Sequence, residues 1–349
     1  MTFTIRTLSM PYNIAMGEGG AFVLETVRNP DIYHGKNKKS NFFEGWYFKI
    51  VQVHTGLTYC FIPGIFVSSR EEQSHSFIQV LKGEESNFKY LRFEKDEFKA
   101  NTSEFNLRVE ENSFCLEQID LHINRQNERI SGTLYFDNIV RWPDSFINPG
   151  SMGFYNYLGF MQCYSQVCAV DGLIRGSLAI NGKTVDFTGG RVYIEKNWGK
   201  AFPYSYIWVQ GNSFKRGDGS VTCSIGHIPL PFPFRSFTGF LIGIYAKGKF
   251  YKFTSINKST LSIRCENEKI ILETQNKDYL LKIEAWYKQE TFMDLYAPRD
   301  GKMVPIASET LQGNLSVTLY DKKRGCPIFE DSSSSAGIEL SGNYIALFP

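Results

Sequence analysis

Residues 45–53 read GWYFKIVQV, and this run of aromatic and β-branched side chains decides the fold class. Such residues are enriched in strands because they pack well on a pleated, half-buried surface. Runs of similar composition follow at 57–67, 76–81, 88–93 and 129–136. Helical periodicity is weak throughout the chain, so we predict an all-β protein built from antiparallel strands.

Local turn signals predict hairpins and further strands. Asn181-Gly182 separates SLAI from KTVDF, and both residues tolerate the positive φ of a type I′ turn. A second hairpin is expected at Lys247-Gly248, and three successive strands are expected within 261–287. Strands are favoured over an amphipathic helix for 152–170, and the serines at 332–335 are expected in a loop or a capped helical turn.

The length of the chain bears on its domain organisation. A chain of 349 residues can form two domains, each with a core of its own. The candidate strands are shared about equally between the two sides of Gly189-Gly190. We therefore predict an N-terminal β-module over residues 1–188 and a C-terminal β-module over residues 189–349.

Composition and charge narrow the choice of partners. The chain carries 38 Lys and Arg against 36 Asp and Glu, a net charge of +2, with no long cationic run. A nucleic-acid partner is therefore not expected. The aromatic content of 15% is high and is typical of a β-rich fold or of an aromatic cavity.

Cysteine usage and the N-terminus bear on the compartment. The seven cysteines are odd in number and form no CxxC pair, which favours a reducing environment. Residues 1–15 contain one basic residue, Arg6, without an apolar segment or a small-residue cleavage site. We expect a cytoplasmic protein, for which a peripheral membrane contact is the route to any lipid-like ligand.

Sequence motifs of the common enzyme classes are absent. The chain has no Walker loop, no GxGxxG after a strand, no GxSxG elbow and no HExxH. Its five histidines are isolated in sequence, so no metal site is predicted. We also expect no organic cofactor.

Two segments place a carboxylate beside tryptophan and are bounded by glycine. They are NFFEGWYFK at 41–49 and GRVYIEKNWGKAFPYSYIWVQGN at 190–212. Polar residues concentrated beside glycines and aromatic residues are costly to bury in an ordinary core. We therefore take these two segments as the candidate functional site.

The same segments resemble the tocopherol cyclase family. FFEGWYFK at 42–49, HSFIQVL at 75–81 and EKNWGKAFPYSYIWVQGN at 195–212 carry the resemblance, and Glu309 with SSSAGIEL near the C-terminus extends it. The resemblance implies two lipocalin-like (calycin-type) antiparallel β-barrel modules. It also implies a reaction in which a phenolic oxygen adds to a prenyl-chain alkene.

That chemistry indicates roles for the residues of both segments. Protonation of an alkene requires a carboxyl group kept neutral by burial, for which Glu44 and Glu195 are candidates. Indole faces can stabilise the carbocation, and amides can orient an oxygen of the ligand. The predicted catalytic residues are Glu195, Glu44, Asn197 and Trp198. The predicted ligand-binding residues are Trp46, Tyr47, His75, Gln162, Tyr164, Trp208, Gln210 and Asn212.

A purely structural interpretation of these residues stays open. A tryptophan on a barrel strand can be part of the core, and a buried glutamate beside Lys196 or Arg191 can be ion-paired instead of protonated. The chain also departs from the family pattern, which is close to MECYHGV. It has Gln162 and Ser165 where that pattern has Glu and His, and neither side chain can replace a titrating acid or base.

Three functions follow from these observations. The first is a cofactor-free, acid-catalysed cyclase or isomerase acting on a prenylated quinol or another isoprenoid or polyene lipid. The second is a binder or carrier of the same hydrophobic ligand without chemistry. The third, ranked last, is a carbohydrate-binding β-sandwich in which exposed tryptophan and tyrosine stack on sugars.

Overall fold

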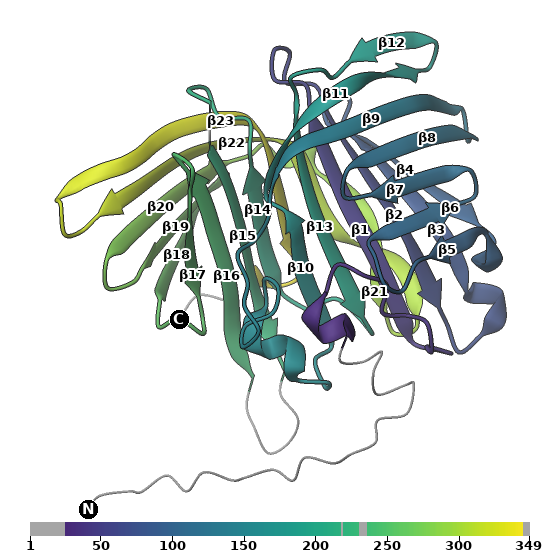
Figure 1. Ribbon diagram of the computed structural model, residues 1–349, viewed down its shortest axis with the longest axis horizontal. Coiled ribbons are helices and arrows are strands. Elements are labelled where there is room, and N and C mark those ends of the chain that lie inside the picture. The colour runs from purple at the N-terminus through teal and green to yellow at the C-terminus, as the bar shows by residue number, and fades with distance from the viewer. Residues whose placement is uncertain (1–24, 218, 230–235, 345–349) are drawn as a thin grey trace, which may run out of the picture.

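The computed structural model describes residues 25–217, 219–229 and 236–344, which form two antiparallel sheets side by side (Figure 1). Short helical turns are the other regular elements of the described residues. They include η1 (Glu71–Gln73), η2 (Lys95–Glu97), η3 (Gly153–Tyr157) and η4 (Gln289–Thr291). The predicted all-β fold is confirmed. The N-terminal residues 1–15, on which the expected absence of a targeting segment rests, lie outside the described residues.

The first sheet has thirteen strands in the described part of the chain. They are β1 (Phe42–Val51), β2 (Thr58–Val67), β3 (His75–Lys82), β4 (Asn87–Phe93), β5 (Phe98–Ala100), β6 (Asn106–Val109), β7 (Asn112–Cys115), β8 (Gln118–Arg125), β9 (Glu128–Val140), β10 (Cys163–Ala169), β11 (Asp171–Ile180), β12 (Lys183–Asp186) and β13 (Arg191–Gly199). Their order is β4-β3-β2-β1-β13-β11-β9-β8-β7-β6-β5, with β10 paired to β13 and β12 paired to β11.

The second sheet has ten strands among the described residues. They are β14 (Tyr206–Gly211), β15 (Gly219–Ile228), β16 (Phe237–Ala246), β17 (Lys249–Thr254), β18 (Thr260–Glu266), β19 (Lys269–Gln275), β20 (Tyr279–Trp286), β21 (Met293–Arg299), β22 (Lys302–Asp321) and β23 (Cys326–Ser341). Their order is β17-β16-β15-β14-β23-β22-β20-β19-β18, with β21 paired to β22.

Both predicted hairpins are present. Asn181 and Gly182 have φ of 50° and 85° between β11 and β12, and Lys247 and Gly248 have φ of 50° and 75° between β16 and β17. Positive φ at both central residues is the requirement of a type I′ turn, whose twist matches that of the flanking strands. The three strands predicted within 261–287 correspond to β18, β19 and β20.

Two local predictions need correction. The serines at 332–335 belong to β23, because they pair with β22 in the register Ser333↔Leu315. Residues 152–170 are not all strand, since η3 precedes β10 there. For the serines, the pairing available in the folded chain overrides local propensity, which is a weak determinant of strand formation.

Alternation along β1 divides its side chains between two environments. Trp46, Phe48 and Ile50 belong to the hydrophobic core enclosed by the first sheet. Phe43 and Tyr47 point to the opposite face and join clusters that lie between the two sheets. A separate core fills the second sheet. Each sheet therefore has its own core, and the predicted fold of two lipocalin-like modules is confirmed.

The chain passes from one sheet to the other between Gly199 and Tyr206. Strand β13 follows the predicted module boundary at 188/189, yet it lies in the first sheet, where β1 pairs with it. The division into 1–188 and 189–349 stays a prediction about folding units. Polar contacts join the sheets along β13, since Asn212 Nδ2 donates to the Val192 carbonyl over 3.0 Å.

Candidate active site

A cavity of about 200 Å³ lies between the two sheets. Strands β1, β10 and β13 contribute one wall, and β14, β15, β16, β22 and β23 contribute the other. Aromatic and aliphatic side chains dominate its lining, together with three carboxyl groups from Glu195, Glu309 and Glu339. An apolar cavity with a few converging polar groups is the usual form of a small-molecule site. The two modules thus share one candidate site.

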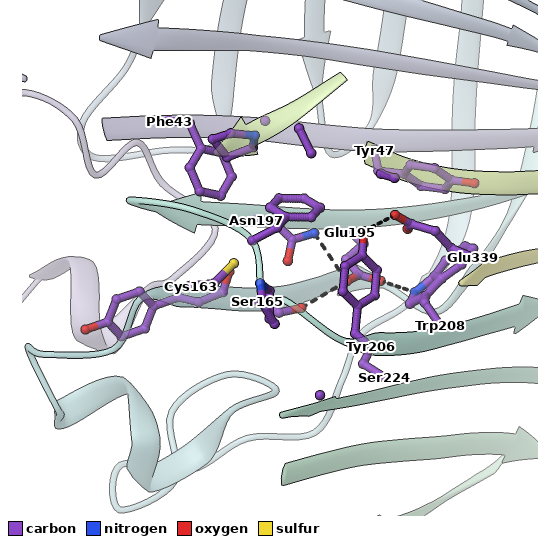
Figure 2. Close-up of a pocket in the computed structure, with 18 of the residues that line it drawn as sticks. Phe43, Tyr47, Cys163, Ser165, Glu195, Asn197, Tyr206, Trp208, Ser224 and Glu339 are labelled. Carbon is purple, nitrogen blue, oxygen red and sulfur yellow. Dashed lines mark hydrogen bonds between the residues drawn. The ribbon is translucent and has the colours of Figure 1, made fainter. Parts of the chain in front are cut away.

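Glu195, on β13, accepts hydrogen bonds from four side chains. Its Oε1 accepts from Ser165 Oγ at 2.9 Å and from Asn197 Nδ2 at 3.5 Å (Figure 2). Its Oε2 accepts from the Tyr193 hydroxyl at 2.6 Å and from the Trp208 indole N–H at 2.8 Å. Burial raises the pKa of Glu195 despite these donors. The carboxyl group is therefore fixed in orientation and easier to protonate than an exposed glutamate.

Glu309 and Glu339 form a cross-strand pair on β22 and β23. The Tyr47 hydroxyl donates to Glu309 over 2.5 Å, and the Tyr206 hydroxyl donates to Glu339. Burial raises the pKa of Glu339 to about 7. Burial and the neighbouring Glu339 charge raise the pKa of Glu309 well above its usual value. Burial and the mutual repulsion of two adjacent carboxylates both favour the form of the pair that retains a proton.

The aromatic donors reach across the boundary between the sheets. Tyr47 is the cross-strand partner of Glu195 in the first sheet, but its hydroxyl binds Glu309 in the second. Trp208 is the cross-strand partner of Glu339 in the second sheet, but its indole binds Glu195 in the first. The carboxyl groups of each sheet are therefore oriented partly by the other sheet, and the site needs both.

Lys49 is a buried cation beside this cluster. Its Nζ donates to Gln210 Oε1 over 2.8 Å and to the Ser335 carbonyl over 2.7 Å, which joins β1 to the second sheet. Burial lowers the pKa of Lys49 to about 7, while the negative charge of Glu309 opposes that shift. Lys49 is not among the residues that line the cavity. It is a tether between the sheets whose charge acts on Glu309.

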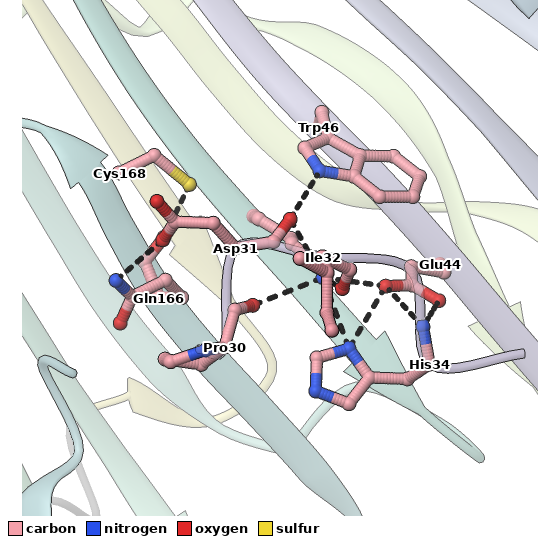
Figure 3. A network of polar contacts seen from close by, with 9 residues as sticks. Pro30, Asp31, Ile32, His34, Glu44, Trp46, Gln166 and Cys168 are labelled. Atoms are coloured by element: carbon pink, nitrogen blue, oxygen red, sulfur yellow. Dashed lines mark hydrogen bonds and ion pairs between the residues drawn. The ribbon is translucent and has the colours of Figure 1, made fainter. Parts of the chain in front are cut away.

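Glu44 lies on the opposite face of β1 and does not line the cavity. Figure 3 shows its carboxyl group in a polar network with His34. Its Oε1 is 2.6 Å from Lys196 Nζ and 3.1 Å from His34 Nδ1. Burial alone would raise the pKa of Glu44, but Lys196 and His34 outweigh it and hold the pKa below its usual value. Glu44 is therefore ion-paired with Lys196, as the structural interpretation of the sequence allowed. We do not assign it the role of the acid that protonates an alkene.

Trp46 and Trp198 also belong to the interior of the first sheet. Lys196 Nζ lies 4.9 Å from the centroid of each indole ring and donates to the carbonyls of residues 30–32. Trp198 stacks on His34 at 4.1 Å between ring centroids. These two tryptophans therefore surround a buried ammonium group and not the cavity.

Five predicted residues do meet at the cavity. They are Glu195, Asn197, Tyr47, Tyr164 and Trp208. Tyr164 stacks on Trp198 at 5.3 Å, and its hydroxyl donates to the Leu158 carbonyl. Its ring thus separates the cavity from the buried network around Lys196.

Besides Trp46, four more predicted ligand-binding residues lie outside the cavity lining. They are His75, Gln162, Gln210 and Asn212. The ring nitrogens of His75 lie 2.6 Å from the Gln73 carbonyl and 2.6 Å from the Tyr90 hydroxyl, a structural arrangement. The backbone carbonyl of Gln162 accepts the N–H of Lys200. Gln210 and Asn212 take part in the contacts between the sheets described above.

Sequence reasoning missed two of the three carboxyl groups as site residues. Glu309 and Glu339 entered that reasoning only as parts of the family resemblance. A glutamate at the centre of an otherwise apolar strand, such as GIEL at 337–340, was the available signal. Tyr206 and Tyr193 were missed because a tyrosine in a strand is ordinarily a packing residue.

Within the residues that the structure describes, no three or more His, Cys, Asp or Glu side chains are grouped so as to hold a metal ion. None of their helices has the length and apolar composition needed to cross a membrane.

Comparison with known proteins supports both fold and family. Residues 118–342 match the family described as "Tocopherol cyclase-like". The chain is 31% identical over 192 residues to "Probable tocopherol cyclase, chloroplastic" of Oryza sativa subsp. japonica, and 30% identical over 193 residues to "Tocopherol cyclase, chloroplastic" of Zea mays. Each alignment spans 52% of this chain and 40% of the plant protein. The crystal structure of CghA matches with a TM-score of 0.52 at 9% identity, over 87% of this chain and 89% of CghA.

The fold and the site together define a class of protein. It is an all-β protein of two lipocalin-like modules that enclose an apolar cavity containing carboxyl groups. The match over 118–342 covers more than half of the sequence, and the chain belongs to the tocopherol cyclase-like family. The family resemblance found in the sequence is confirmed.

Proposed function

We propose that the chain is a cyclase-like enzyme that isomerises a prenylated quinol, or a related alkene-bearing phenol, by acid catalysis without a cofactor. The observation that carries the proposal is the Glu309–Glu339 pair, two adjacent carboxyl groups in an apolar cavity with raised pKa values. Such a pair holds a proton at neutral pH that it can donate. Family membership supports the reaction class.

The reaction needs a proton donor and a place for the proton that the phenol loses. The acid of the Glu309–Glu339 pair adds its proton to one alkene carbon, so a C–H bond forms as the π bond breaks. The phenolic oxygen then bonds to the carbocation and gives up its own proton to the carboxyl cluster. The cluster ends with as many protons as it began with, and the product is an isomer of the substrate.

Glu195 and the aromatic donors have separate roles in this scheme. Four side chains donate to Glu195, whereas one donates to each of Glu309 and Glu339, so Glu195 is the group of the three whose carboxylate form has the most donors. When Glu195 is ionised, its negative charge beside the apolar cavity stabilises a carbocation, and the Trp208 and Tyr206 rings that line the same cavity add their π faces. Exclusion of water by the cavity protects the cation from hydration.

Incubation of the purified protein with a prenylated hydroquinone tests the proposal. Chromatography and mass spectrometry would follow an equal-mass chromanol product, and quenching of tryptophan fluorescence would follow binding. Glu339→Gln is expected to abolish turnover while binding persists. Glu128→Gln is the matched control, because Glu128 is a buried carboxylate paired with Lys82 outside the cavity.

Each outcome of that experiment separates the alternatives. Product formed by the wild type and the control, but not by Glu339→Gln, supports acid catalysis by the pair. Ligand that binds to the wild type without conversion overturns the enzyme and favours the carrier. Absence of both binding and product overturns the proposed ligand class.

A further inference from the structure

A group of exposed hydrophobic side chains lies on the segment that precedes β10. Phe146, Ile147, Phe154, Tyr157 and Phe160 have exposed fractions between 40% and 72%. They account for half of the large hydrophobic residues exposed in the described part of the chain, within fifteen positions of the sequence. Concentration of exposed apolar side chains in one place indicates an interaction surface. These five residues are called the apolar patch below.

Contacts join three residues of the apolar patch, Phe146, Phe154 and Tyr157. The Tyr157 hydroxyl donates to the Phe146 carbonyl over 2.5 Å, and the Tyr157 and Phe154 rings lie 6.3 Å apart. Two side chains of the same segment bind backbone carbonyls. Asn156 Nδ2 donates to the Pro149 carbonyl over 2.7 Å, and Ser151 Oγ donates to the Ser165 carbonyl. The segment is thus held in shape while its apolar side chains face outward.

The same segment forms part of the cavity. Met152, Tyr155 and Met161 line it, and they alternate in sequence with the residues of the apolar patch. The turn η3 lies at the lower edge of the sheets in Figure 1, where β10 begins. The apolar patch and part of the cavity lining therefore belong to the same short segment.

Two basic residues, Arg28 and Lys200, lie next to the segment that carries the apolar patch, and one acidic residue, Asp144, precedes it and accepts the Gly150 N–H. The Arg28 guanidinium lies 5.0 Å from the centroid of the Phe146 ring. Lys200 is exposed, and its N–H donates to the Gln162 carbonyl just beyond Phe160. Residues 145–162 contain no charged residue. An uncharged aromatic surface with cations at its border matches an anionic lipid interface, in which rings enter the acyl boundary and cations meet the headgroups.

Two more lysines lie at the same edge of the first sheet. Lys38 and Lys39 are exposed in the loop that leads into β1. At that edge Phe43 of β1 and Cys163 of β10 both pair with Gly199, the last residue of β13. The loop, the start of β10 and Lys200 therefore lie at the same end of β13. Arg28, Lys38, Lys39 and Lys200 are called the basic border below.

We infer that the apolar patch docks the protein on an anionic lipid membrane, from which the hydrophobic ligand passes directly into the cavity. The inference rests on the proposed function only for the hydrophobic nature of that ligand. Docking itself requires the five exposed side chains and the basic border, and neither takes part in the chemistry.

Vesicle flotation without substrate tests the inference. Wild-type protein is expected to float with vesicles of phosphatidylcholine and phosphatidylglycerol, and to float less at high salt or with phosphatidylcholine alone. The variant Phe146→Ser, Ile147→Ser, Phe160→Ser should lower the partition coefficient about tenfold or more. The matched control is Tyr135→Ser, Trp286→Ser, which removes two aromatic side chains that are 44% and 37% exposed and lie outside the cavity.

The readouts distinguish docking from catalysis. The triple variant should convert a detergent-dispersed substrate as the wild type does, because none of its three positions lines the cavity. Absence of turnover in every variant would count against the proposed function and leave the flotation result unchanged. Docking is overturned if the wild type does not float, or if the triple variant floats as well as the control. A dimer that the triple variant converts to monomer, with vesicle binding unchanged, would assign the apolar patch to a second copy of this chain.

Discussion

Trp208 of the second sheet donates its indole N–H to Glu195 of the first sheet over 2.8 Å. Both residues line the cavity and both are buried. A residue of one sheet thereby orients a carboxyl group of the other. The cavity site is accordingly a property of the pair of sheets, and a change at this contact should affect both catalysis and the association of the sheets.

Trp208→Phe should weaken both catalysis and the association of the two sheets. The change keeps an aromatic ring in the cavity but removes one of four donors to Glu195, so the carboxylate form loses stability. We expect the free energy of unfolding to fall by about 1–2 kcal/mol, measured by chemical denaturation, because a buried acceptor loses a partner. Turnover should fall about tenfold or more. Trp286→Phe, at an exposed site, is the control, and an equal effect of both changes would refute the role given to Trp208.

The raised pKa of Glu339 predicts a defined dependence of stability on pH. The folded pKa of about 7 lies above the unfolded value near 4.5, so the folded state binds more protons between these values. The free energy of unfolding must therefore fall as pH rises through that window. Relative to Glu339→Gln, the free energy of unfolding of the wild type should fall by roughly 2 kcal/mol between pH 5 and pH 8.

Denaturation at a series of pH values measures this difference. Glu309 adds to the effect with the same sign, because burial, together with the Glu339 charge, raises its pKa. Turnover of the wild type should also decrease above pH 7 as the pair loses its shared proton. Identical pH profiles for the wild type and Glu339→Gln would contradict the shifted pKa.

Glu44→Gln should destabilise the protein without removing its chemistry. The change leaves the Lys196 ammonium without its carboxylate partner in the interior of the first sheet, which commonly costs about 3–5 kcal/mol. Turnover at a temperature where the variant is folded should stay within about threefold of the wild type. A variant that folds normally but has lost all activity would restore Glu44 as the acid.

Ala307→Phe should reduce ligand binding by narrowing the cavity. Ala307 is a small, buried side chain in the cavity lining, next to the region of Glu309. A phenyl ring there occupies space needed by the ligand, and we expect the Kd for a prenylated hydroquinone to rise about tenfold. Isothermal titration calorimetry measures the change. Ala285→Phe, in the separate core of the second sheet, controls for overpacking alone, and equal losses from both variants would argue against binding in the cavity.

Local signals in the sequence were sufficient for much of the fold. Strand composition at 45–53 and the positive φ demanded at Asn181-Gly182 both act over a few residues, so β1 and the β11–β12 hairpin could be predicted. The strand conformation of the serines at 332–335 could not be predicted, because their place in β23 depends on pairing with β22. Local propensity does not include such distant partners.

The sequence by itself determined the fold class, the family resemblance and Glu195 as a candidate acid. Only the tertiary structure decided which carboxyl groups share the cavity. Glu44 and Glu195 both stand beside tryptophan in sequence, but strand alternation turns Glu44 toward Lys196 and Glu195 toward the second sheet. Glu309 and Glu339 reach Glu195 from strands more than a hundred positions away, through the packing of two sheets. Because burial and neighbouring charges set the pKa of each group, its chemistry is fixed only when those neighbours are in place.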